Sequence, residues 1–300
     1  MRYCNRALAA LFVGIAIVPG AAHAQDSGWT IDPSLDVAVR AVTSNFDLRD
    51  DDAPINGDAI AVLVSPSVTA ENGALSLRLR NSTYRIEYLE DDFSDRWRSV
   101  TGAEIAYATD ANGSVGAFVE YGDNLSTAES PRTDQWQYGA ELERRFGTEH
   151  RVRLQGSWRE RDYDDLAGSE GSGPRLNGEY RYRFAANHYL YLRGSAEDID
   201  SDTARRNFDR QAVSIAYQRP LARDFRIRPE VRYRHTDFTG RLLPDGDFRS
   251  DDVVIPELTL LYSPGDWLFS LEGRYLLRDS TDPEFDRNGY RVSLEARYEF

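Results

Sequence analysis

The sequence has 300 residues, a net charge of −14 and a mean hydropathy of −0.58, and 29% of its residues are charged. This acidity argues against nucleic-acid binding, which depends on basic patches. The low mean hydropathy and the lack of a second long apolar run argue against a helical inner-membrane protein, but not against a β-barrel, whose lumen-facing residues are polar.

The N-terminus has the three parts of a secretory signal peptide. Arg2 and Arg6 precede an apolar run over Ala7–Val18, and small residues lead to a cleavage position after Ala24. The apolar run is too short for a membrane-spanning helix, which needs about 20 apolar residues. We therefore expect residues 1–24 to be removed on export.

The mature chain, residues 25–300, is expected to form one exported domain. The single cysteine, Cys4, lies in the predicted leader. The mature protein is therefore expected to have no disulfide framework and no thiol chemistry.

After the leader, apolar and polar residues alternate with a period of two, which is typical of β-strands with two unlike faces. The first strand is expected over Ser34–Asn45 and is followed by an acidic loop over Asp47–Asp58. The second strand is expected over Ala59–Ala70. It ends at Glu71–Gly73, a strong signal for a tight hairpin turn.

The third strand, expected over Ala74–Leu89, has a break in its alternation. Its apolar residues begin on one parity, as at Leu79, and continue on the other parity from Tyr84. We expect a β-bulge near Asn81, because one extra residue in a strand shifts the faces of the residues that follow.

From residue 96 onward, short turns alternate with long polar loops, as periplasmic turns and external loops do. The short turns are expected at 110–113, 147–149, 185–187, 219–223 and 263–266, and the long loops at 122–133, 162–175, 198–209, 238–251 and 279–287. With a last strand at Asn288–Phe300, the chain has about fourteen strands of membrane-crossing length. We therefore predict an all-β fold, a closed antiparallel up-and-down transmembrane β-barrel.

Aromatic residues lie near both ends of the predicted strands, as in the two interfacial belts of membrane barrels. With periplasmic termini, the external belt contains Trp97, Trp136, Trp158 and Tyr290, and the periplasmic belt contains Tyr107, Phe146, Phe184, Tyr262, Trp267 and Phe300. A soluble β-sandwich, which is the alternative for an exported all-β chain, has no reason to build two such belts.

The C-terminal strand alternates strictly between apolar and polar residues and ends on an aromatic side chain. This ending resembles the closing strand of bacterial outer-membrane β-barrels, whose terminal aromatic residue is the usual assembly signal. The resemblance implies that Tyr298 and Phe300 are recognised by the barrel-assembly machinery. It also implies a place in the bacterial outer membrane, in contact with its lipid and lipopolysaccharide.

The polar parity of the strands is expected to line the lumen, because an Arg facing the middle of the lipid costs about 2–4 kcal/mol. About fourteen strands should enclose a narrow wet lumen, since eight-stranded barrels are filled and roughly sixteen strands leave a channel. The residues predicted to line it are Arg151, Arg153, Arg159, Arg161, Arg181, Arg183, Arg226, Arg228, Glu230, Arg232, Arg234 and Arg274. They either pair across strands, with about 0.2–1 kcal/mol for each pair, or form a positive stripe that favours anions.

Catalysis has little support in the sequence. The mature chain contains His150, His188 and His235, and none has a Ser or Asp partner at a suggestive spacing on the lumen face. The acidic loops lack the spacing of an EF-hand, although carboxylates are natural ligands of Ca²⁺ and Mg²⁺. We expect no enzymatic activity, no cofactor and no dedicated metal site.

In length, strand number and charged lumen, the chain resembles the monomeric fourteen-stranded porins. This resemblance implies a channel for passive diffusion of small hydrophilic solutes, and the positive stripe of arginines would give that channel a preference for anions. An alternative rests on Asp286-Arg287 and the final strand, which are similar to the end of the barrel in the surface lipoprotein assembly modifier family, and implies a role in export or assembly. A third alternative is a structural or adhesive barrel whose lumen is closed by its loops.

Overall fold

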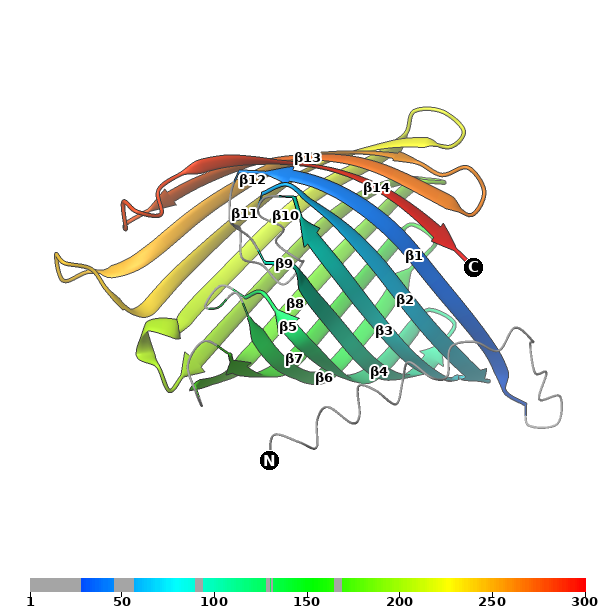
Figure 1. Cartoon of the computed structure of the whole chain (residues 1–300). Coiled ribbons are helices and arrows are strands. Elements are labelled where there is room, and N and C mark those ends of the chain that lie inside the picture. The colour runs from blue at the N-terminus through cyan, green and yellow to red at the C-terminus, as the bar shows by residue number, and fades with distance from the viewer. Residues whose placement is uncertain (1–27, 46–56, 90–93, 128–129, 131, 165–168) are drawn as a thin grey trace.

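The computed structural model describes residues 28–45, 57–89, 94–127, 130, 132–164 and 169–300 (Figure 1). Over these residues, fourteen antiparallel strands form a closed barrel in which each strand pairs with its sequence neighbours and β1 pairs with β14. The predicted fold class and strand number are confirmed. The strands are β1 (Thr30–Ser44), β2 (Ala59–Asn72), β3 (Leu75–Tyr88), β4 (Arg96–Asp110), β5 (Gly113–Leu125), β6 (Thr133–Phe146), β7 (His150–Tyr163), β8 (Ser169–Ala185), β9 (His188–Ser201), β10 (Phe208–Pro220), β11 (Phe225–Leu242), β12 (Phe248–Tyr262), β13 (Trp267–Ser280) and β14 (Asn288–Glu299).

One short 3₁₀ helix, η1 (Ala204–Arg206), lies between β9 and β10. Within the described residues, no helix has the length and apolar character needed to cross a membrane. The predicted signal peptide at residues 1–24, and most of the acidic loop predicted at Asp47–Asp58, lie outside the described residues.

The two faces of the sheet differ as the alternation predicts. Large apolar side chains such as Leu154, Leu192 and Leu271 are exposed on the outer surface of the barrel. Charged side chains such as Arg159 and Glu197 are buried inside it. The protein therefore has a polar interior and an apolar exterior, the arrangement of a barrel surrounded by lipid.

Several strands extend into regions that the sequence predicts as loops. β7 continues to Tyr163 and β8 begins at Ser169, although residues 162–175 are predicted as a loop. β11 and β12 likewise extend into the loop predicted at 238–251. Pairing of backbone groups does not require apolar side chains, so hairpins continue after the alternating pattern has ended.

The β-bulge predicted near Asn81 is wrong. β3 pairs with β2 and with β4 in one constant register on both sides of this residue. The change of parity instead puts Ile86 inside the barrel, where it packs with Val42, Ala59 and Ala61. This part of the wall therefore has apolar side chains on its inner face and polar side chains on its outer face.

The barrel closes where the last strand meets the first. Val37 pairs with Tyr298 and Ser44 with Arg291, and the Phe300 amide donates to the Leu35 carbonyl at 3.0 Å. Among the fourteen strands that the structure describes, each has a paired neighbour on both sides, as full closure of a barrel requires.

Candidate channel interior

The polar interior contains a cavity of about 630 Å³. Its positive lining residues are nine arginines from β3, β4 and β7 to β11: Arg80, Arg98, Arg153, Arg159, Arg175, Arg193, Arg210, Arg232 and Arg234. Its acids are Glu120, Glu179 and Glu197. Among the described residues, nine guanidinium groups and three carboxylates line the cavity, and Glu141 and Glu230 lie beside the lining in contact with three of these arginines, so the cavity has an excess of positive charge.

The structure brings four of the residues predicted to line the lumen to this cavity: Arg153, Arg159, Arg232 and Arg234. The others have the same inward parity but do not line it: Arg151, Arg161, Arg181, Arg183, Arg226, Arg228, Glu230 and Arg274. The predicted set therefore falls on the inner wall, spread beyond the cavity itself.

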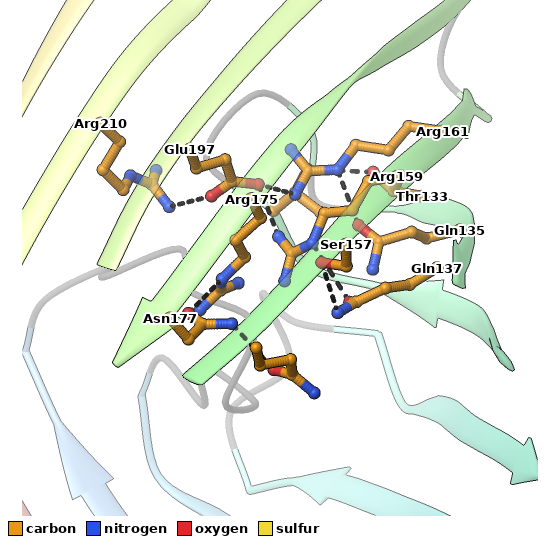
Figure 2. Close-up of polar contacts among 12 residues, drawn as sticks. Thr133, Gln135, Gln137, Ser157, Arg159, Arg161, Arg175, Asn177, Glu197 and Arg210 are labelled. Carbon is orange, nitrogen blue, oxygen red and sulfur yellow. Dashed lines mark hydrogen bonds and ion pairs between the residues drawn. The ribbon is translucent and has the colours of Figure 1, made fainter. Parts of the chain in front are cut away.

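A compact group of charges forms one wall of the cavity, around Glu197 of β9 (Figure 2). Its carboxylate lies 2.5 Å from a guanidinium nitrogen of Arg159, 2.8 Å from Arg161 and 3.8 Å from Arg210. Each of these four side chains is almost completely buried. We call these four residues the Glu197 cluster.

Two amides also contact the Glu197 cluster. Arg159 Nε donates to Gln137 Oε1 at 3.2 Å, and Arg161 Nε donates to Gln135 Oε1 at 2.8 Å. Amide oxygens satisfy guanidinium donors without neutralising their charge. One carboxylate therefore serves three buried cations, and the cluster has a net positive charge.

Elsewhere on the inner wall, the predicted arginines pair with acids on the same strand or on neighbouring strands. Arg153 contacts Glu141 at 2.5 Å, and Arg151 pairs with Glu179. Arg274 lies 2.8 Å from both Glu257 and Glu272. These contacts stabilise the wall and match the pairing alternative from the sequence.

The positive stripe predicted on β11 is also partly paired. Arg228 lies 3.8 Å from Glu257, and Arg232 lies 3.6 Å from Glu230. Glu230 also contacts Arg193 of β9 at 3.5 Å. The excess of positive charge therefore belongs to the cavity as a whole and not to β11 alone.

Sequence analysis missed several cavity residues, above all Arg175 and Arg210. Arg175 is the last residue of a predicted loop, and Arg210 directly follows another. In the structure both belong to extended strands, and Arg175 Nε donates to Asn177 Oδ1 at 2.9 Å. If the alternation of inward-facing and outward-facing residues is extended from the predicted strands into these loops, both arginines fall on the inner face.

Aromatic residues and arginines pack together where the long hairpins begin. The Arg249 guanidinium lies 4.6 Å from the ring centre of Phe238 and 3.4 Å from that of Phe285. Arg206 of η1 is buried 4.2 Å from the Tyr163 ring. Cation–π contacts of this kind hold the loops against the barrel.

The connection between β5 and β6 also lies against the protein. Ser126, Thr127 and Ser130 are buried, and the Thr127 amide donates to the Ser130 carbonyl at 2.8 Å. Leu125, at the start of this connection, lines the cavity. The described part of this loop therefore packs against the barrel, and its first residue reaches the cavity.

Comparison with solved structures gives three similar barrels. The outer-membrane channel DcaP of Acinetobacter baumannii has a TM-score of 0.56 at 11% identity, over 92% of this chain and 98% of that chain. An anion-selective porin from Comamonas acidovorans gives 0.53 at 8% identity, over 91% and 100%. A loop-deletion mutant of OmpT, an outer-membrane protein of Vibrio cholerae, gives 0.50 at 13% identity, over 91% and 100%.

The chain has the fold of the bacterial outer-membrane β-barrels. At these identities the likeness concerns the fold alone. No protein-family model matches the sequence, and no curated protein matches it.

The closing strand of this outer-membrane barrel has the features predicted for it. Tyr298 and Phe300 lie on the outer surface, with ring centres 4.5 Å apart in an edge-on arrangement, and Phe300 is 69% exposed. Trp267 of β13 packs against Tyr298 at 4.9 Å. The terminal aromatic residue is therefore accessible on the outer side of the seam.

The three histidines of the barrel face outward, away from the cavity. His150 and His188 bond the hydroxyls of Tyr180 and Tyr217 at 2.7 and 2.6 Å. His235 lies between Asp237 and Asp252. Over the part of the chain that the structure describes, no group of three His, Cys, Asp or Glu side chains could hold a metal ion.

Proposed function

We propose that this outer-membrane barrel is a channel for passive diffusion of small hydrophilic solutes, with a preference for anions. The observation that carries the proposal is the cavity inside the wall, lined by nine arginines and three glutamates. In a narrow lumen with low-dielectric walls, such an excess of one charge concentrates ions of the opposite sign.

The structural neighbours support this proposal at the level of the fold. Two of them are described as an outer-membrane channel and as an anion-selective porin. The proposal includes export through a signal peptide cleaved after residue 24 and insertion by the barrel-assembly machinery. It places the barrel in the outer membrane, with lipid and lipopolysaccharide around it, and assigns it no catalytic role.

Ion selectivity in a planar bilayer tests the proposal. We expect the refolded protein to conduct in steps and to give a reversal potential on the anion side in a salt gradient. The test variant is R153Q/R193Q, because both side chains line the cavity and are substantially exposed to it. Arg153 pairs with Glu141, and Arg193 pairs with Glu179 and Glu230, so the loss of both arginines makes the lining less positive and the reversal potential should move toward cations.

The matched control is R144Q. Arg144 pairs with Asp110 at 2.5 Å on the outer surface, and its removal does not change the charge of the cavity. The control should keep the wild-type reversal potential. A cation-selective wild type, or an unchanged potential in the folded double variant, would contradict the anion preference.

A second candidate is the structural or adhesive barrel with a closed lumen. The packing of Arg249 between Phe238 and Phe285 and the burial of the β5–β6 connection favour it. The same bilayer experiment separates the two functions, because a correctly folded barrel that never conducts is closed.

A further inference from the structure

A group of polar side chains lies on the outer surface of β3 and β4. Asn81 Nδ2 donates to Ser99 Oγ at 3.0 Å and to Thr101 Oγ1 at 2.8 Å. The Thr83 hydroxyl donates to Asn81 Oδ1 at 2.9 Å and lies 3.0 Å from Ser99 Oγ. We call these four connected residues the β3–β4 polar patch.

The register places the patch on the outside of the barrel. Thr83 is directly opposite Val64 of β2 and Ser99 of β4, and directly opposed residues point to the same face. Val64 is 40% exposed, whereas neighbours of the other parity, such as Arg80 and Arg98, line the cavity.

Apolar side chains surround the patch on the outer surface. Leu79 precedes Asn81 on the same face of β3, and Trp97 precedes Ser99 on the same face of β4. The exposed apolar neighbours on β2 to β5 are Val62, Val64, Leu79, Trp97, Ile105 and Val119. The patch therefore lies within the apolar exterior and not at its rim.

The fold offers no local reason for polar residues at this place. A bulge could have turned the apolar residues after Asn81 outward, but the register of β3 is constant. Tyr84 and Ile86 instead pack inside the barrel. Because the apolar residues of this part of β3 face inward, the amide and the three hydroxyls of the patch face the membrane.

Polar side chains on a membrane-facing surface are typical of contacts between membrane proteins. Between transmembrane helices, Ser, Thr and Asn side chains bond across the interface, and the small Ser and Thr let two backbones approach closely. The patch keeps capacity for such bonds, because a carboxamide oxygen accepts two hydrogen bonds and a hydroxyl donates one and accepts two. Lipid chains can supply none of them.

The chemistry of the patch fits a second copy of the same chain. The four side chains are uncharged, and they contain donors and acceptors together, so the patch is complementary to itself. Copies inserted in one orientation can be related by a two-fold axis along the membrane normal, which brings the same patch of each to the same depth.

The charged residues beside the patch are also compatible with a two-fold contact between two copies. Arg85 lies 3.0 Å from Asp95 and 3.5 Å from Glu87, so both signs are present next to one another. A symmetric contact can then oppose unlike charges. We propose that the β3–β4 polar patch is the contact surface of a two-fold dimer of this barrel in the membrane.

Site-directed cross-linking in membranes tests the contact. The predicted mature chain has no cysteine, so S99C and T101C each introduce one reactive thiol. A short bis-maleimide should link two copies of each variant. The control is V213C, because Val213 is exposed on the outer face of β10, diametrically across the barrel from β3.

The mass of the protein in detergent is the second measurement. We expect two chains for the wild type and a shift to one chain for N81L/T101V, whose apolar side chains remain suited to the exterior. Heat-modifiable migration on a gel confirms that this variant is folded. Loss of the dimer should leave the bilayer conductance of each barrel in place, so this inference and the channel proposal can fail separately.

The dimer is overturned if S99C and T101C cross-link no more than V213C, or if they link to a different protein. A wild type with the mass of one chain also overturns it, as does an unchanged mass in N81L/T101V. Efficient homodimer cross-links at both patch positions, together with the loss of the dimer in the apolar variant, would establish it.

Discussion

Replacement of Glu197 by glutamine should be the most destabilising isosteric change in the interior of this barrel. The Glu197 carboxylate is the shared partner of Arg159, Arg161 and Arg210, and all four side chains are buried. A glutamine keeps the shape and one acceptor oxygen but removes the charge. The three guanidinium groups would then lose the carboxylate that they share.

Removal of one partner from a buried ion pair costs about 3–5 kcal/mol, and we expect E197Q to lower the free energy of unfolding by that amount. The matched control is E120Q, which breaks the pair with Arg80, a side chain that is half exposed. Exposed pairs contribute about 0.2–1 kcal/mol, so E120Q should be nearly neutral. Each of the two substitutions removes one negative charge from the inner wall.

Urea unfolding of refolded protein in lipid vesicles, followed by tryptophan fluorescence, measures the difference. Addition of sulfate should reduce the difference in free energy of unfolding between E197Q and wild type, with both proteins measured in the same buffer. The reason is that an anion that binds only the folded protein stabilises it. Equal stability of E197Q and E120Q would refute the view that the Glu197 carboxylate holds this cluster together.

Three further predictions concern assembly, topology and the outer end. Deletion of Phe300 should lower the yield of heat-modifiable, folded barrel, and normal insertion would mean that the C-terminal resemblance was misleading. In intact cells, an impermeant thiol reagent should label E170C but not P264C, whereas the reverse would invert the barrel. R249A should raise single-channel conductance, because Arg249 holds Phe285 and Phe238 together, and an unchanged conductance would mean that this packing lies outside the ion path.

Local alternation in the sequence is sufficient to predict most of the strands and the number of them. It works because each strand has one face toward lipid and one toward the interior, so the period-two signal repeats along the chain. Asn81 shows where this reasoning fails. The sequence shows that apolar residues change parity there, but not whether the backbone bulges or the two faces of the wall exchange their chemistry.

The cavity depends on contacts that the sequence cannot show. Glu197 and Arg159 belong to strands that are not adjacent, and they meet because both project into one interior. Arg175 and Arg210 were hidden because polar hairpin extensions look like loops. The export or assembly role suggested by Asp286-Arg287 remains a prediction, since none of the comparisons tests it.

The seam between β1 and β14 also determines when the protein can fold. Arg40 Nε donates to Glu295 Oε2 at 2.8 Å across this seam, and 255 residues separate the two in the chain. Closing a loop of that length costs about 3 kcal/mol more in chain entropy than closing a hairpin of ~10 residues. Every other strand pair is local, so hairpins can form early while this contact, with by far the greatest sequence separation, must come last. The barrel therefore cannot close before β14 is available to pair, and until then β1 remains an open edge that other chains could occupy.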